Sequence, residues 1–225
     1  MTIHRPGQPE DLPPGEVLWA RWALLAAVET TTEREEIPTV HRTGHWIDEA
    51  GLHWDDAGCT WWVMSRRGEG RFVLYGEDES SGVKWHEPAI DMLAGGPDWL
   101  PYEELRDRLE GYELGCVYWY ENGAWSRAPY PDSLDDDGLD CGMGDFVDRG
   151  DLLRELARYL DDTADGSGRD SLLADAEAHR LDARLLLERL RSHADGDPLD
   201  PPAVARALDR AGITALRPDL QGRDA

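Results

Sequence analysis

The sequence is poor in basic side chains, and in lysine above all. It holds 47 acidic against 23 basic residues, a formal net charge of −24, and Lys84 is its only lysine. A charge of this sign opposes contact with nucleic-acid phosphates or anionic lipids, because each such contact needs a cation from the protein. We therefore expect neither direct nucleic-acid binding nor membrane binding.

Cysteine is also scarce. The three cysteines, Cys59, Cys116 and Cys141, form neither a Cys-x-x-Cys pair nor an even disulfide set, which is typical of a reducing compartment. No segment approaches the ~18 consecutive apolar residues of a membrane-spanning helix, and the N-terminal stretch lacks a signal-peptide core. These absences predict a cytoplasmic protein. The near-exclusive use of arginine favours a bacterial source with a GC-rich genome, and the acidic excess would also suit a salt-loving organism.

Tryptophan is abundant, and two segments rich in aromatic residues have the pattern of β-hairpins. In the first, apolar runs at 59–64 and 71–75 flank a short turn that contains glycine. The stretch from 41 to 56 mixes histidine, tryptophan, acids and glycine, and we expect loop or a short strand there. The first hairpin would then be the centre of the fold.

The second hairpin carries the stronger signal. Asn122-Gly123 separates two aromatic runs, and this dipeptide favours a type I′ turn because both of its residues must adopt positive φ. The turn fixes the register of the strands beside it. The side chains that it places on one face are Tyr118, Tyr120, Trp125 and Arg127.

Apolar residues at helical spacing predict three helices, over 16–29, 102–112 and 149–160, and we expect the first to be amphipathic. Together with the hairpins they predict an α+β fold. Its antiparallel sheet would be built from at least two β-hairpins and covered by these helices.

Composition divides the chain into four parts. All ten tryptophans lie at or before Trp125, and the sequence after 165 is rich in alanine, leucine and arginine. We expect Asp182 and Asp200 to cap helices in this later part and Gly212 to end the last one. The predicted parts are a flexible or draped leader (1–15), an α+β domain (16–165), a small three-helix module or extension packed on that domain (166–217) and a disordered tail (218–225).

Two features indicate partner binding. The face of the second hairpin is rich in tyrosine, tryptophan and arginine, which dominate interface hot spots, although the alternative is that the same side chains pack on the helices as core. The loop that follows contains Asp135, Asp136 and Asp137, whose charges favour a basic partner. The interpretation is a non-enzymatic acidic binding protein, without a cofactor, that docks a basic protein partner. An inhibitor or immunity-type role would suit its charge, and no pattern specifies an oligomeric state.

The alternative is a metal-dependent hydrolase or small-ligand-binding protein. Carboxylates and a histidine follow the first hairpin, and such ligands suit a divalent ion, although their spacing matches no known metal motif. The residues in this hypothesis are Glu77, Asp78, His86 and Glu87. Two weaker hypotheses are calcium bound by the loop 132–140 and zinc bound by His41, His45, His53 and Cys59.

Overall fold

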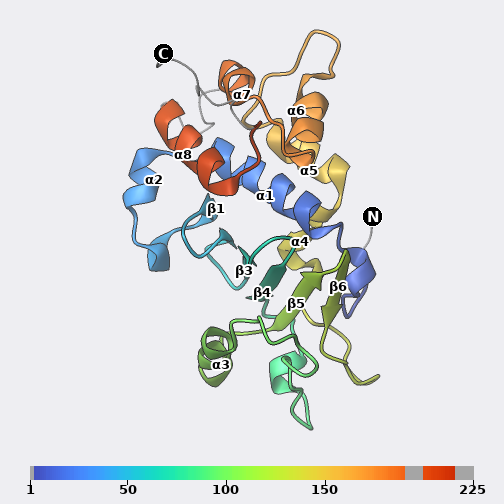
Figure 1. Cartoon of the computed structure of the whole chain (residues 1–225). Helices are drawn as coiled ribbons and strands as arrows, with labels where there is room; N and C mark the ends of the chain where they lie inside the picture. The colour runs from blue at the N-terminus through green and yellow to red at the C-terminus, as the bar shows by residue number, and fades with distance from the viewer. Residues whose placement is uncertain (1–2, 191–199, 216–225) are drawn as a thin grey trace, which may run out of the picture.

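The computed structural model describes residues 3–190 and 200–215, and it has the predicted α+β fold (Figure 1). Six strands form one antiparallel sheet in chain order, so each strand pairs with the next along the chain. The loops between successive strands therefore lie at the two ends of the sheet. The strands are β1 (Gly44–Ile47), β2 (Leu52–Asp55), β3 (Trp61–Arg66), β4 (Phe72–Glu77), β5 (Cys116–Glu121) and β6 (Ala124–Arg127).

Both predicted hairpins are present, as β3–β4 and β5–β6. The Asn122-Gly123 turn gives the predicted register, with Tyr120 opposite Trp125 and Tyr118 opposite Arg127. The mixed stretch 41–56 forms more regular structure than expected. It contains β1 and β2, which are a third hairpin paired to the edge of β3.

Helix α1 (Gly15–Glu29) confirms the first predicted helix but not its amphipathic character. Thirteen of its 15 residues are buried, because the sheet lies on one side and other helices lie on the other. Its alanines let neighbouring elements approach closely. The guanidinium of Arg21 is buried but satisfied, since it donates to Glu177 and to the carbonyls of Phe146 and Val147 at 2.7–3.0 Å.

The helices after residue 148 lie on the side of α1 away from the sheet, and a smaller cover lies on the opposite face of the sheet (Figure 1). Helix α1 and the helices packed on it share one hydrophobic core. On the other face, α3 and the segment between β4 and β5 cover a second core around Tyr75 and Trp119. The helices are α2 (Thr32–Glu36), α3 (Tyr102–Glu110), α4 (Asp140–Val147), α5 (Arg149–Leu156), α6 (Gly168–Glu177), α7 (Ala183–Arg189) and α8 (Pro201–Ala211).

The helix ends expected after residue 165 are present. Asp182 accepts hydrogen bonds from the first backbone N–H groups of α7, and Asp200 does so for α8. Gly212 ends α8 in the left-handed conformation, with φ of 64°. Helices α6 and α8 pack on α1, and their apolar residues belong to the core around that helix. The predicted tail, 218–225, lies outside the described residues.

The leader is draped over the sheet rather than free of it. It contains a short 3₁₀ helix, η1 (Pro9–Asp11), and its side chains Ile3 and Leu12 are buried. Gly7 is also buried, and its backbone contacts the side chains of Tyr118 in β5 and of Asp137 in the loop after β6. Within 3–190 and 200–215, no helix is long and apolar enough to cross a membrane.

Candidate functional site

The aromatic face of the second hairpin is core rather than surface. Tyr118, Tyr120 and Trp125 are buried beneath the leader and α1. The Tyr118 hydroxyl oxygen lies 2.8 Å from the Gly7 carbonyl oxygen, and the Trp125 indole N–H donates to the Pro13 carbonyl at 2.7 Å. These side chains hold the leader in place, so they cannot also contact a partner in this structure.

Arg127 lies at the rim of the same face and is half-buried. Its Nε donates to the Gly7 carbonyl at 3.0 Å, and its guanidinium lies 3.8 Å from the ring centre of Tyr130. The cation is therefore occupied by an internal stacking contact. Of the two alternatives for this face, the structure corresponds to packing.

The three consecutive aspartates have three different environments. Asp137 is buried and accepts from the Gly7 N–H at 2.9 Å and the Tyr118 hydroxyl at 2.7 Å. Asp136 lies 3.7 Å from the guanidinium of Arg5. Only Asp135 is fully exposed. Asp137 supports the fold, and Asp135 alone of the three presents its charge freely to solvent.

The residues of the metal hypothesis do not converge. Glu77 pairs with Lys84, and Asp78 is buried, where it accepts from the Thr60 hydroxyl and the Ser80 backbone N–H. His86 bonds through its two ring nitrogens to the Pro88 carbonyl and the Ser133 hydroxyl, both at 2.8 Å. Glu87 is exposed. The described residues hold no group of three or more His, Cys, Asp or Glu that is placed to bind a metal ion.

Two of the three histidines of the zinc hypothesis have carboxylate partners. His45 lies 2.8 Å from Glu29, and His53 lies 2.8 Å from Asp48. Burial would raise the pKa of Glu29, but hydrogen bonds from His45 and from the hydroxyl of Tyr159 lower it to about 2. The Glu29 carboxylate is thus a buried anion, which is stabilised by His45 of β1 and by Tyr159, three residues after the end of α5.

Several of the loops that connect the antiparallel strands meet at one end of the sheet. The loop after β4 donates from Gly82 N to the Asp136 carbonyl at 3.0 Å, and His86 joins it to Ser133. The turn after α3 joins the same region, because Gly115 N donates to the Gly76 carbonyl at 2.8 Å. We call this region the acidic end and define it by five exposed carboxylates: Glu79, Glu87, Glu113, Asp132 and Asp135.

A stacked pair of aromatic side chains is exposed at the acidic end. Trp85 is 64% exposed and Tyr112 is 62% exposed, and their rings are nearly parallel, with centres 5.7 Å apart. Trp85 belongs to the 3₁₀ helix η3 (Val83–Trp85), whereas Tyr112 follows α3 in a left-handed conformation with φ of 58°. Sequence reasoning missed this pair, because its members are 27 positions apart and lie in no regular strand.

Lys84, the only lysine of the sequence, connects the segment that carries Trp85 with the segment that carries Tyr112. Lys84 Nζ donates to the Tyr112 carbonyl at 3.1 Å and also pairs with Glu77. Burial lowers the pKa of Lys84, because the ammonium is less well solvated there than in water. Its partners are internal, and the cation therefore positions the surface instead of neutralising the exposed carboxylates.

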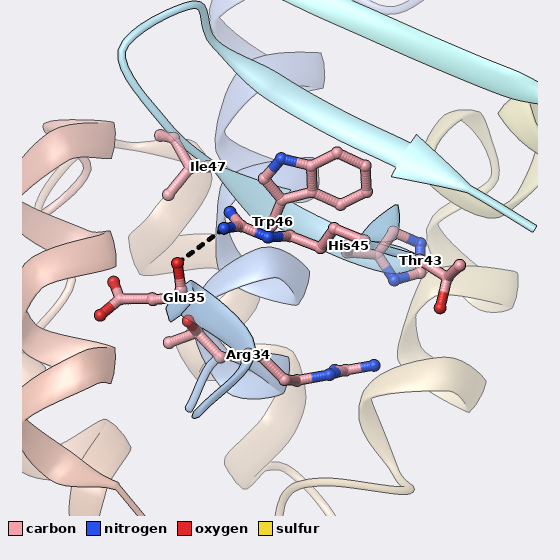
Figure 2. A pocket seen from close by; sticks show the side chains of 8 residues that line it. Arg34, Glu35, Thr43, His45, Trp46 and Ile47 are labelled. Carbon is pink, nitrogen blue, oxygen red and sulfur yellow. Dashed lines mark hydrogen bonds between the residues drawn. The ribbon is translucent and has the colours of Figure 1, made fainter. Parts of the chain in front are cut away.

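An enclosed pocket away from the acidic end is too small for a ligand. Its volume is about 10 Å³, room for one water molecule, and its walls come from α2 and β1 (Figure 2). Arg42 closes one side by donating to the Glu35 carbonyl at 2.8 Å. Other lining residues include Arg34, His45 and Trp46.

Comparison with protein-family models, curated proteins and solved structures gives no match for this chain. Function must therefore be argued from the site alone. The acidic end with its exposed aromatic pair is the strongest candidate, since the other sequence-predicted residues are buried or bonded internally.

Proposed function

We propose that this chain is a non-enzymatic, acidic binding protein of the cytoplasm that docks a basic protein partner at its acidic end. The observation that carries the proposal is an exposed aromatic pair, Trp85 and Tyr112, standing among exposed carboxylates. Large aromatic side chains are unusual on a free surface and common at the centre of interfaces. An inhibitor or immunity-type role against a basic protein is one form that this function would take.

Charge supports the choice of partner. Within the described ranges, four of the carboxylates form no ion pair with Arg, Lys or His: Glu79, Glu87, Asp132 and Asp135. These four charges are part of the net charge of −24 on the whole chain, and together they produce a negative field at this end of the sheet. Such a field attracts a basic partner over long distances at low salt and repels nucleic acids and acidic proteins.

The test compares two double variants with the same change in net charge. Asp132→Asn/Asp135→Asn neutralises the acidic end, whereas Glu33→Gln/Glu36→Gln neutralises exposed residues of α2. The probe is a synthetic peptide that mixes arginine and lysine, titrated by calorimetry at about 0.01 M and about 0.15 M salt, where the Debye length falls from about 30 to about 8 Å.

We expect binding that weakens steeply with salt and is unaffected by a chelator. We also expect Asp132→Asn/Asp135→Asn to weaken binding more than Glu33→Gln/Glu36→Gln does. Equal loss in the two variants would show that the peptide responds to net charge alone, and the assignment of docking to the acidic end would then be wrong. Absence of binding by the unmodified protein at low salt would count against the function itself.

A further inference from the structure

We propose that the Trp85–Tyr112 pair is a stacking site for an arginine side chain of the basic partner. This inference rests on the proposed function and specifies it further: the anchoring cation is a guanidinium rather than an ammonium. The evidence is the geometry of the pair, its surroundings, and the way in which this chain's own aromatic side chains are covered.

The pair is a fixed platform rather than two loose side chains. The rings are 14° from parallel, so they present flat faces in a common direction. Val83, two residues before Trp85, is buried in the core under α3. On the other side, the Tyr112 carbonyl accepts from Lys84 Nζ at 3.1 Å. A preorganised surface loses little conformational entropy when it binds.

Elsewhere in the structure, arginines lie over aromatic rings of this chain. Arg66 lies 4.7 Å from the ring centre of Trp19, and Arg108 lies 5.0 Å from that of Trp61. Arg71 covers Trp99, Arg106 covers Tyr102 and Arg127 covers Tyr130.

Among residues 3–190 and 200–215, no arginine lies over Trp85 or Tyr112. Lys84 approaches Trp85 to 5.4 Å, but its ammonium is already bonded to Glu77 and the Tyr112 carbonyl. The pair is therefore an exposed aromatic surface without the arginine that covers comparable rings in this protein.

The chemistry of the site favours a guanidinium over an ammonium. A guanidinium is planar, weakly hydrated and able to stack on a ring, and its fork of N–H donors can also meet a carboxylate. Glu113 follows Tyr112 directly, and Glu87 lies two residues after Trp85. An ammonium holds its water more strongly and gains less from an exposed ring. A second copy of this chain is a poor occupant, because each copy carries a net charge of −24.

The experiment uses two peptides of equal length and charge, one with arginine and one with lysine at every basic position. Their affinities are measured by calorimetry for the full chain and for Trp85→Ala and Trp85→Leu. Val40→Ala is the matched control, since Val40 is an exposed apolar side chain in η2 (Thr39–His41), outside the acidic end.

We expect the arginine peptide to bind the unmodified protein roughly two- to fivefold more tightly than the lysine peptide. Both Trp85 variants should remove this difference, because leucine keeps apolar area but lacks a π face, while Val40→Ala should preserve it. Equal affinity for the two peptides, unchanged by Trp85→Ala, would overturn the stacking site and leave the acidic docking function standing. Failure of both peptides to bind would instead remove the proposed function.

Discussion

At the scale of single residues, the structure places several charges where water cannot reach them, and each has a specific partner. Glu29 is the clearest case. Its carboxylate accepts from the His45 backbone N–H at 2.9 Å and from the Tyr159 hydroxyl at 2.6 Å, and it lies 2.8 Å from His45 Nδ1. Removing the Glu29 carboxylate takes an ionised acceptor away from both His45 and Tyr159 at once.

We predict that Glu29→Gln destabilises the fold, and that the loss depends on pH. Hydrogen bonds lower the pKa of Glu29 to about 2 in the folded state, from 4.5 in the unfolded chain. A carboxyl group whose pKa is lower in the folded state stabilises the fold at pH values above its pKa in the unfolded chain. This stabilisation is lost as the pH falls toward its pKa in the folded state. The contribution at neutral pH is on the order of 3 kcal/mol.

Urea unfolding of the two proteins at about pH 7 and about pH 3 measures this effect. The difference in the free energy of unfolding should be smaller at the lower pH. Glu33→Gln, at an exposed position of α2, is the control and should change little at either pH. A difference for Glu29→Gln that is the same at both values would show that the ionised carboxylate is not what stabilises this site.

At the scale of elements, the parts that follow local chemistry are the parts that the sequence predicts. Asn122-Gly123 specifies a two-residue turn, and with it the whole register of β5 and β6. Asp200, followed by two prolines, marks the start of α8, and Gly212 marks its end. Such signals need no knowledge of distant contacts.

Other elements depend on tertiary contacts and were predicted poorly. Strands β1 and β2 are short and mixed in composition, and they are stable because β3 and α1 lie beside them. Helix α4 is not among the helices that the spacing predicts, and its backbone is kinked at Cys141 and Gly142. The burial of α1 on nearly all sides was also missed, since alanine is compatible with exposed and buried faces alike.

The β5–β6 turn permits a clean test of backbone geometry. Gly123 has a φ of 83°, and a Cβ there would meet nothing within 4 Å, so Gly123→Ala changes only the conformational cost. We expect a loss of about 1 kcal/mol in the free energy of unfolding. Gly144 in α4 also has open space around it and no positive φ. Gly144→Ala should therefore be neutral or stabilise by up to about 1 kcal/mol. A reversed order in chemical denaturation would contradict this interpretation.

At the scale of the whole molecule, contacts between distant segments decide which side chains are buried and which are exposed. The sequence pattern correctly put four side chains on one face of β5 and β6. It could not show that the leader and α1 cover that face, because this depends on contacts more than 90 residues apart, such as that of Trp125 with Pro13. The exposed pair Trp85 and Tyr112 arises in the same way, from two loops that only the folded sheet brings together.

The same reasoning bears on the apparent boundary near residue 165. Composition changes there, yet α6 and α8 pack on α1 and complete its burial. The Trp19 indole N–H donates to the Ala211 carbonyl at 2.8 Å, and Arg21 pairs with Glu177 at 2.7 Å. A chain that ends at residue 165 would expose the apolar side of α1 and leave the cation of Arg21 without its carboxylate.

We therefore predict that residues 1–165 alone do not form a cooperatively unfolding domain. Thermal unfolding followed by near-ultraviolet circular dichroism should lose its sharp transition, and a dye that binds exposed apolar surface should fluoresce more strongly than with the full chain.

Leu208→Ala is a milder companion variant, because this buried side chain lies on α8; it should cost about 2–5 kcal/mol while the chain still folds. A sharp transition for residues 1–165, at the temperature of the full chain, would instead show two independent domains. In that case the helices after residue 165 would be an attachment to the fold, and Leu208→Ala should leave the main transition unchanged.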